Sequence, residues 1–274
     1  MTSAVSIEAS LQVVEATLIP VSAFVVCKNE EKHIAQCLES LNFCDEILVV
    51  DSFSTDRTPE ICKSHNVTFI QRSWPGYREQ KEFAANSAKN EWVFFLDADE
   101  RLTEDLKIEI LNLFKPENSE TLNSYDGFYV CRVMYFLGKW WRKGGWYPDN
   151  VIRLFKKSKT SWLGIDPHEV VTVDGKLGKL NGEIEHFSYD NLPDQVNKLS
   201  SHALTRARAD SLLEKEASIS RMFVNPILRF LKFYFLKKGF LEGFPGLIVA
   251  ILEAYYTFLK YVYLWELNRE KDRV

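Results

Sequence analysis

Residues 92–100 contain an apolar run that ends in a cluster of carboxylates, and this stretch constrains the fold most. The run Trp92-Val93-Phe94-Phe95-Leu96 is typical of a strand buried on both faces of a largely parallel sheet. Asp97, Asp99 and Glu100 follow it directly. In an extended chain Asp97 and Asp99 would point to the same side, because side chains alternate. The stretch should therefore end at the sheet edge where open α/β folds bind ligands.

Clustered carboxylates at the end of a buried strand are costly unless a cation neutralises them. Mg²⁺ or Mn²⁺ prefers such oxygen ligands and leaves positions for water and for substrate phosphates. The alternative is a polar turn in which Asp99 or Glu100 lies near the N-terminus of a helix at Thr103. A lone Asp-x-Asp pattern is common by chance, so the choice between the two depends on the rest of the chain.

Composition and charge describe a globular protein with two unlike parts. Apolar residues make up 46% and charged residues 26% of the 274 residues, which is enough to bury a full core. Residues 191–274 carry 13 Lys and Arg against 9 Asp and Glu, whereas the whole chain has a net charge of −4. An acidic part that needs a cation and a basic, aromatic tail imply different partners. No nucleic-acid partner is predicted.

The cysteines and the N-terminus indicate a cytoplasmic location. The five cysteines are scattered without metal-site spacing, which fits reduced thiols. Residues 1–20 lack the basic start and the long apolar run of a signal peptide, and we expect a weakly ordered leader there. Residues 21–190 are predicted to form one α/β domain, and residues 191–274 a helical region.

Apolar runs alternate with helical patterns through the first part of the chain. Further strands are predicted at residues 21–27, 46–51 and 67–70, which is the pattern of a doubly wound α/β domain with a mostly parallel sheet. Asn29 after the first strand is either a helix N-cap or part of the ligand crevice. Neither a Gly-x-Gly-x-x-Gly after the first strand nor a Gly-x-x-x-x-Gly-Lys occurs, so dinucleotide-binding and P-loop classes are poorly supported.

Three motifs in this order resemble the nucleotide-binding half of the family 2 glycosyltransferases, the inverting GT-A group. They are residues 21–31, residues 49–58 (VVDSFSTDRT) and residues 95–100 (FLDADE). VIRLF at 151–155, PHEVV at 167–171 and YFLKKGF at 234–240 are similar to the lipopolysaccharide-core β-1,4-glucosyltransferase branch of that family. The resemblance implies a GT-A fold and glycosyl transfer.

The resemblance also implies roles for several residues. Asp51 would accept a hydrogen bond from the uracil of a UDP-sugar, and Asp97 would contact ribose or metal. Asp99 would hold Mg²⁺ or Mn²⁺ on the diphosphate, where the metal stabilises charge on the leaving UDP. Asn29 and Glu31 would line the nucleoside pocket.

Inversion needs one general base, which takes the proton of the attacking acceptor hydroxyl. The candidates are Asp149, Asp166 and Glu169. We predict Glu169, because it begins a short apolar strand after a loop that contains Gly and Pro. His168 beside it is a further metal or phosphate contact, or else a packed loop histidine. His186 is a weaker candidate of the same kind.

Cationic and aromatic residues supply the remaining candidates. Lys81 contacts a phosphate or else lies on a solvated helix face, and Arg153 is a further possible contact. Residues 135–146 are aromatic, basic and Gly-rich, and are predicted to bind the acceptor through Trp141 and Arg142. The alternative is that this segment forms a hydrophobic corner of the fold.

The chain is predicted to be helical from residue 193. Residues 221–268 are aromatic with interspersed cations: Arg229, Lys232, Lys237 and Lys238. Charged residues interrupt the apolar run 244–265, and a spanning helix needs ~20 apolar residues, so we predict helices that lie in the membrane interface. The alternative is a helical hairpin packed on the α/β domain or on a partner subunit.

Together these patterns predict a metal-dependent inverting glycosyltransferase, peripheral on the cytoplasmic face of the inner membrane. It is expected to move a hexose, glucose from UDP-glucose, to a lipid-linked saccharide such as a lipopolysaccharide core. One alternative is a sugar-nucleotide nucleotidyltransferase, although the Gly-rich cationic loop of that class is missing. Another is a non-catalytic membrane-binding module. The donor sugar, the acceptor hydroxyl and the oligomeric state are not determined by the sequence.

Overall fold

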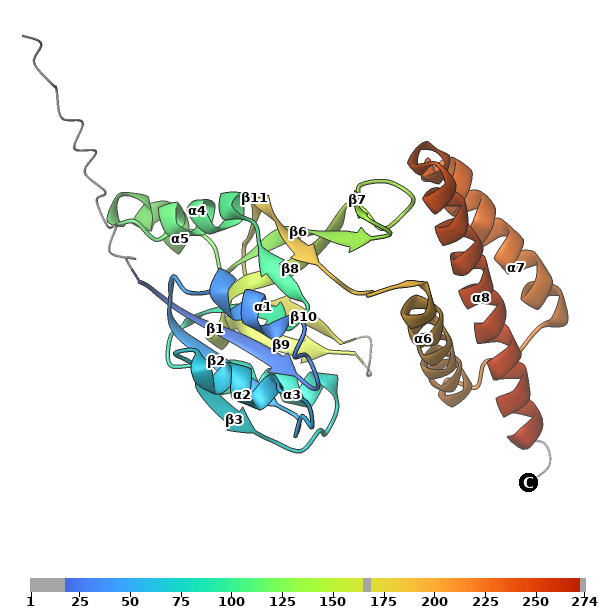
Figure 1. Ribbon diagram of the computed structural model, residues 1–274, viewed down its shortest axis with the longest axis horizontal. Coiled ribbons are helices and arrows are strands. Elements are labelled where there is room, and N and C mark those ends of the chain that lie inside the picture. The colour runs from blue at the N-terminus through green and yellow to red at the C-terminus, as the bar shows by residue number, and fades with distance from the viewer. Residues whose placement is uncertain (1–17, 165–168, 272–274) are drawn as a thin grey trace, which may run out of the picture.

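The protein consists of an α/β domain and a three-helix unit beside it (Figure 1). This computed structural model describes residues 18–164 and 169–271. Most of the predicted leader, as well as Asp166 and His168, lies outside the described residues.

The first four strands in one half of the sheet are parallel, as predicted. They are β3 (Thr68–Gln71), β2 (Cys44–Asp51), β1 (Ile19–Cys27) and β4 (Trp92–Asp97), in this spatial order. Their buried apolar runs explain the arrangement, because helices cover both faces of this half. Strand β1 begins two residues earlier than predicted. The carboxyl ends of β1, β2 and β4 meet at one edge of the sheet.

The other half of the sheet is mixed. Strand β8 (Asp149–Lys156) runs antiparallel to β4 and is followed by β6 (Gly127–Phe136), β11 (Leu177–His186) and β5 (Glu100–Leu102). The short β7 (Lys139–Trp141) pairs with β6. The antiparallel pairing of β5 with β11 places Glu100 opposite His186, and so brings the acidic stretch after β4 to the end of a strand much later in the chain.

Two apolar cores lie on the two faces of the sheet. Helices α1 (Ile34–Ser40), α2 (Thr58–Ser64) and α4 (Glu104–Leu113) contribute to one core. The other core contains residues of α3 (Tyr77–Ser87), which faces the hairpin of β9 (Thr160–Leu163) and β10 (Val170–Val173). The short α5 (Ser119–Asn123) follows α4.

The carboxylates after β4 do not continue in extended conformation. The chain turns at Ala98 and Asp99, so the alternation predicted for Asp97 and Asp99 does not hold. Glu100 belongs to β5 and is fully buried, whereas α4 starts only after Thr103, whose hydroxyl caps it by accepting from the Leu106 N–H. Neither Asp99 nor Glu100 caps that helix.

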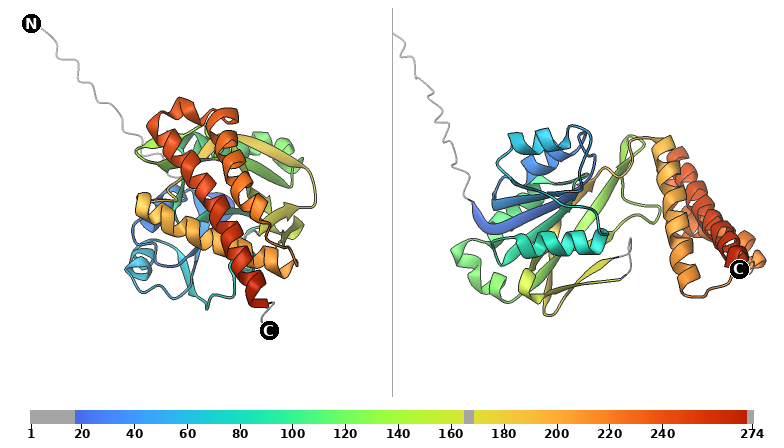
Figure 2. Two further views of the ribbon diagram at one scale, coloured as in Figure 1. Left: turned by 90° about the vertical axis from the view of Figure 1, so that its right-hand side faces the viewer. Right: turned by 90° about the horizontal axis from the view of Figure 1, so that it is seen from below.

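The C-terminal unit is formed by α6 (Leu192–Leu212), α7 (Ile219–Leu231) and α8 (Phe244–Lys271) (Figure 2). Helix α8 packs against both other helices. By length and composition alone it is apolar enough to cross a membrane, and only 17% of its most apolar window is buried. The sequence had led us to expect a run too interrupted for that.

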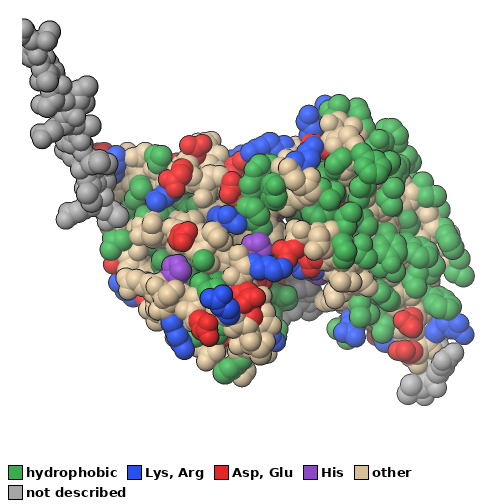
Figure 3. All heavy atoms as spheres, viewed as in Figure 1, with side chains coloured by type: hydrophobic (Ala, Val, Ile, Leu, Met, Phe, Trp, Pro, Cys, Tyr) green, Lys and Arg blue, Asp and Glu red, His purple; other side chains and the backbone are tan. Residues whose placement is uncertain are grey.

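Helix α7 and the π-helical turn η3 after it (Lys232–Leu236) expose a continuous apolar surface, visible among the side chains on the right of Figure 3. We call this surface the apolar face: Phe223, Val224, Ile227, Leu228, Leu231 and Phe235. The spacing of three or four residues puts these side chains on one side of the helix. Contiguous exposed apolar surfaces are typical of sites that bind a membrane or another protein.

The Trp-rich segment joins the helical unit to the α/β domain. Trp141 is fully buried against Val249 of α8, and Trp146 donates its indole N–H to Glu253 of α8 over 2.9 Å. Gly145 is required at φ +98°, where an added Cβ would lie 2.8 Å from the ring of Phe233. Contrary to the prediction, Trp141 therefore has no surface free for a sugar, and the alternative of a hydrophobic corner describes it better.

Candidate active site

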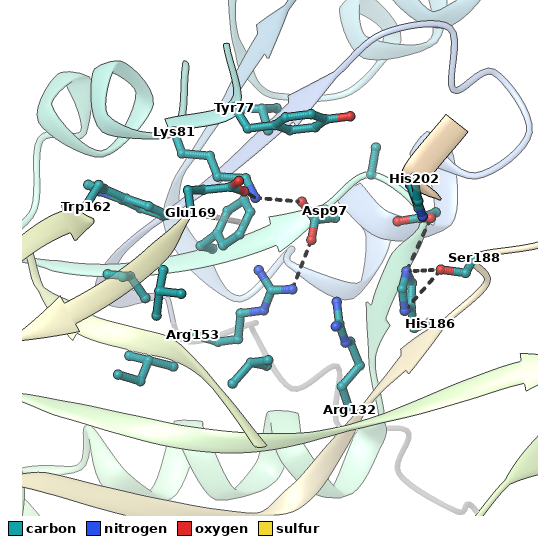
Figure 4. A pocket seen from close by; sticks show the side chains of 18 of the residues that line it. Tyr77, Lys81, Asp97, Arg132, Arg153, Trp162, Glu169, His186, Ser188 and His202 are labelled. Atoms are coloured by element: carbon teal, nitrogen blue, oxygen red, sulfur yellow. Dashed lines mark hydrogen bonds and ion pairs between the residues drawn. The ribbon is translucent and has the colours of Figure 1, made fainter. Parts of the chain in front are cut away.

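A cavity of about 1430 Å³ lies between the carboxyl edge of the parallel strands and the helical unit. We call it the main cavity (Figure 4). Its walls come from β1, β4, β8, the β9–β10 hairpin and all three C-terminal helices. It contains the two aspartates of the Asp-x-Asp motif together with Lys81, Arg153 and Glu169.

Asp97 is held between two cations. Its carboxylate lies 3.6 Å from the Lys81 ammonium and 3.0 Å from the Arg153 guanidinium. Burial would raise the pKa of Asp97, but the charges of Lys81, Arg153 and Arg132 outweigh it and hold the pKa well below its usual range. Asp97 is therefore already neutralised by side chains, which leaves it less charge to offer a metal.

Glu100 anchors the two arginines beneath Asp97. It is fully buried and accepts from Arg153 over 2.6 Å and from Arg132 over 2.9 Å. Arg132 also contacts Asp149 at 2.7 Å. A buried carboxylate of this kind would be costly alone, so its role in the structure is to fix both guanidinium groups in place.

Asp99 contacts His186 rather than the cations around Asp97. The distance between the carboxylate and the imidazole Nε2 is 3.4 Å, and Ser188 lies 2.7 Å from the same nitrogen. Burial would raise the pKa of Asp99, but the charge and hydrogen bond of His186 prevail and lower it. The register of β5 and β11 creates this pair.

Asp99 and His186 suit a divalent metal. One carboxylate oxygen and one imidazole nitrogen fit Mn²⁺ or Mg²⁺, and open positions would remain for diphosphate oxygens and water. Within residues 18–164 and 169–271 there is no group of three His, Cys, Asp or Glu side chains that could hold a metal. A bound nucleotide would thus have to complete the coordination.

Glu30 adds a further carboxylate to the wall of the main cavity. Burial, together with the negative charge of Asp99, raises its pKa to about 7. In the unfolded chain a glutamate titrates near pH ~4.3. The folded protein therefore binds a proton at Glu30 more strongly than the unfolded chain does.

This difference predicts a pH dependence of stability in the metal-free protein. The protonated side chain of Glu30 favours the folded state, and this contribution to the free energy of unfolding is fully present below pH ~4.3. It is lost as the pH rises through about 7. We expect Glu30→Gln to gain stability relative to the wild type between pH 5 and about 7.5, measured by urea unfolding in EDTA. A constant difference between the two proteins over that range would contradict the prediction.

Among the candidate carboxylates, Glu169 has the surroundings that best suit a general base. Its Oε1 lies 2.6 Å from the Lys81 ammonium. Its Oε2 is buried and has no hydrogen-bond partner among the described residues, although Glu169 lines the main cavity. Lys81 is itself buried over the ring of Phe95, so it is no solvated helix residue. One oxygen of Glu169 is thus fixed while the other remains able to accept a proton.

Asp51 lies beneath the cavity rather than in its wall. It is fully buried and accepts from the Ser54 N–H and from the Gln71 amide, each over 3.0 Å. Among the described residues that line the main cavity, Asp51 is not present. In this structure it shapes the loop after β2, and its predicted contact with uracil stays a prediction.

Asn29 and Glu31 connect the loops after β1 and β2. Asn29, at φ +57°, accepts from the Thr55 N–H over 2.8 Å, and Glu31 accepts from the Arg57 N–H over 3.0 Å. Neither lines the main cavity in the described part of the chain, whereas Glu30 between them does.

Asp149, a candidate base, and Arg142, a candidate acceptor contact, both form ion pairs with other residues of the protein. Asp149 is paired with Arg132, as described above, and Arg142 forms a bidentate ion pair with Glu183 away from the lining of the main cavity. Sequence reasoning did not single out Glu30 and Arg132, which line the main cavity, and it gave His186 only as a weaker candidate. The signal for His186 was its place at the end of a strand, but the partner strand was unknown.

The sequence profile described as "Glycosyl transferase family 2" matches residues 22–173, more than half of the chain. The protein belongs to glycosyltransferase family 2, and its α/β domain has the GT-A-like fold of that group. It is therefore an enzyme that transfers glycosyl groups.

The chain is similar to the lipopolysaccharide core biosynthesis glycosyltransferase LpsC of Rhizobium meliloti. The two are 31% identical over 267 residues, covering 93% of this chain and 95% of LpsC. An uncharacterized glycosyltransferase of Rickettsia typhi is also 31% identical, covering 93% of this chain and 89% of its own length.

Solved structures with likeness to this one have lower identity. TarS 1–349 of S. aureus has a TM-score of 0.41 at 16% identity, with 92% of this chain and 91% of that chain covered. Glucosyl-3-phosphoglycerate synthase of Mycobacterium tuberculosis, solved with Mn²⁺ and UDP, has a TM-score of 0.33 at 19% identity, with 43% of this chain and 44% of that chain covered.

Proposed function

We propose that the protein is a metal-dependent inverting hexosyltransferase that uses a UDP-sugar, glucose in the first instance, and a lipid-linked saccharide acceptor. One observation carries this proposal. Glu169 presents a buried oxygen, without a hydrogen-bond partner among the residues that the structure describes, in the same cavity as the Asp99–His186 pair. A base and a metal-binding pair in one cavity are what inversion at a sugar diphosphate requires.

The proposed reaction is a single displacement. The acceptor hydroxyl oxygen attacks the anomeric carbon, and the bond from that carbon to the diphosphate oxygen breaks with its electron pair leaving on UDP. Glu169 takes the hydroxyl proton, and Lys81 holds the other oxygen of Glu169. A metal held by Asp99 and His186 would supply Lewis-acid stabilisation of the charge on the diphosphate. Ion pairs with Arg132 and Arg153 keep Asp97 and Glu100 in position.

A donor screen tests the proposal. Purified full-length protein would be incubated with Mn²⁺, a lipid-linked saccharide extract and one nucleotide hexose at a time, and the released nucleotide would be measured. We expect acceptor-dependent release of UDP from one UDP-hexose and none from GDP- or ADP-sugars. Equal release from a GDP-sugar, or Mn²⁺-independent turnover, would contradict the proposed donor and metal. The relative LpsC makes a lipopolysaccharide-core acceptor the first choice for the extract.

Family membership does not favour the two alternatives drawn from the sequence. A nucleotidyltransferase would belong to another class of enzyme, and a module without catalysis would not need the combination of Glu169, Asp99 and His186 in one cavity.

The helical unit supports a peripheral position on the inner membrane, with the apolar face against the lipid. Ile227 on that face is 60% exposed. Since burying a side chain of this kind is worth ~1.5–3 kcal/mol, Ile227→Ser should weaken binding to liposomes by about tenfold or more. Ile108 on α4 is 53% exposed in the α/β domain, so Ile108→Ser is a matched control.

Co-sedimentation with liposomes that contain anionic lipid measures this effect. The wild type and Ile108→Ser should sediment alike, and Ile227→Ser should remain largely in the supernatant with an unchanged thermal midpoint. A wild type that ignores such liposomes at low salt would mean that the apolar face is covered by protein instead of lipid.

A further inference from the structure

A second cavity, of about 490 Å³, lies within the helical unit. We call it the basic cavity. Helix α6 contributes Arg206 to its wall, α7 and η3 contribute Asn225, Arg229 and Lys232, and α8 contributes Lys260. The mechanism proposed above makes no use of these residues.

The basic cavity has more positive than negative charge. Its wall contains four cations, and in the described part of the chain two carboxylates contact them. Asp210 lies 3.5 Å from Arg206 and 3.9 Å from Lys260, and Glu253 lies 2.7 Å from Arg229. Within the described residues Lys232 has no ion pair. Among these described residues, four cations and two carboxylates leave a net charge of +2, and like charges gathered in a cavity favour a bound anion.

Hydroxyl and amide groups in the same wall can hold an anion by hydrogen bonds. Tyr261 accepts from the Asn225 amide over 2.6 Å, so its own hydroxyl proton is available to a further acceptor. Tyr256 adds one more hydroxyl group, whereas the Thr257 hydroxyl donates to the Glu253 backbone carbonyl over 3.0 Å. Several donors together with Lys and Arg are the usual recognition chemistry of phosphate.

The basic cavity lies between the apolar face and the main cavity. Leu228 belongs both to its wall and to the apolar face. Arg229 and Tyr256 line the basic cavity on one side and the main cavity on the other. A molecule anchored in lipid beside α7 would pass the basic cavity before it reached Glu169.

We propose that the basic cavity binds a phosphate group carried by the lipid-linked acceptor and thereby positions the acceptor hydroxyl in the main cavity. The identity of the bound molecule as an acceptor rests on the proposed function, whereas the phosphate chemistry rests on the cavity alone. A phosphate on an ordinary bilayer lipid has the same chemistry, and the experiment separates the two sources.

The first arm measures binding of the full-length protein to vesicles, without any nucleotide sugar. Phosphatidylcholine vesicles carry either phosphatidic acid, which has a phosphate monoester, or phosphatidylserine, at matched surface potential. We expect the wild type to bind the phosphatidic acid vesicles about tenfold more tightly than the phosphatidylserine vesicles. One additional charge-assisted hydrogen bond lowers the Kd by about this factor. Lys232→Gln with Lys260→Gln should abolish the preference, and Lys232→Gln alone should reduce it.

Lys237→Gln with Lys238→Gln is the matched control. Both lysines are exposed and outside the basic cavity, and the double change removes the same charge. Binding to both kinds of vesicle should weaken, but the preference should persist. A wild type without preference, or equal loss of preference in both double variants, would overturn the proposal. Inorganic phosphate that competes at the same concentration as the vesicle phosphate would overturn the lipid-linked assignment.

The second arm uses transfer to the lipid-linked saccharide extract. Phosphatidic acid should compete with the acceptor, raising its KM in the wild type and leaving that of Lys232→Gln with Lys260→Gln unchanged. Unchanged or increased transfer by the wild type would show that the cavity holds a bilayer lipid, contrary to the proposal. A protein that prefers phosphatidic acid vesicles but releases no UDP would instead contradict the proposed donor and leave the basic cavity assignment standing.

Discussion

Glu169→Gln is expected to lower the turnover number by ~10²–10⁴, the usual cost of losing a general base. The substitution keeps the shape of the side chain and one hydrogen bond to Lys81, but it removes the oxygen that accepts the proton. Mn²⁺-dependent binding of UDP should stay close to that of the wild type, because the acceptor side alone is changed. Turnover assays and calorimetric UDP titration separate the two effects.

Asp149→Asn is the matched control, since Asp149 was the other described candidate for the base and lies against Arg132. We expect this variant to retain most of the activity. An active Glu169→Gln protein together with an inactive Asp149→Asn protein would transfer the role of base to Asp149.

Asp99→Asn should abolish turnover and Mn²⁺-dependent UDP binding together. The change removes the charge of the only acidic member of the Asp99–His186 pair in the described structure. A metal that binds the folded state at 100 times its Kd adds ~2.7 kcal/mol of stability. The wild type should therefore melt at a higher temperature with Mn²⁺ and UDP, and the variant should show little shift.

Asp105→Asn provides the comparison, because Asp105 is an exposed acidic residue in the first turn of α4. It should behave as the wild type in both thermal shift and turnover. Full activity of Asp99→Asn, or of the wild type in excess EDTA, would contradict the role of Asp99 and of the metal.

The sequence allowed the parallel half of the sheet to be predicted, since buried apolar runs and strand ends are local signals. It also placed Asp97 and Asp99 at the ligand-binding edge, and both line the main cavity. The side chains that contact these aspartates could not be predicted from the sequence. Which strand lies beside β5 depends on the whole fold, so the contact of Asp99 with His186 and the ion pairs of Asp97 had no local signature.

Other patterns in the sequence are compatible with two different structures. Aromatic and basic residues accompany both sugar binding and close packing, and Trp141 belongs to the second kind. Polar residues that follow a strand can line a ligand pocket, or they can connect two loops. The hydrogen bonds of Asn29 and Glu31 connect the loops after β1 and β2. Composition alone did not distinguish these cases.

The position of β11 between β6 and β5 has a consequence for the protein as it leaves the ribosome. Strands β1, β2 and β4 emerge first and can pair at once, whereas His186 arrives with the last strand of the sheet. Domains generally form from the N-terminus during synthesis. A nascent chain thus cannot assemble the Asp99–His186 pair until the α/β domain is complete.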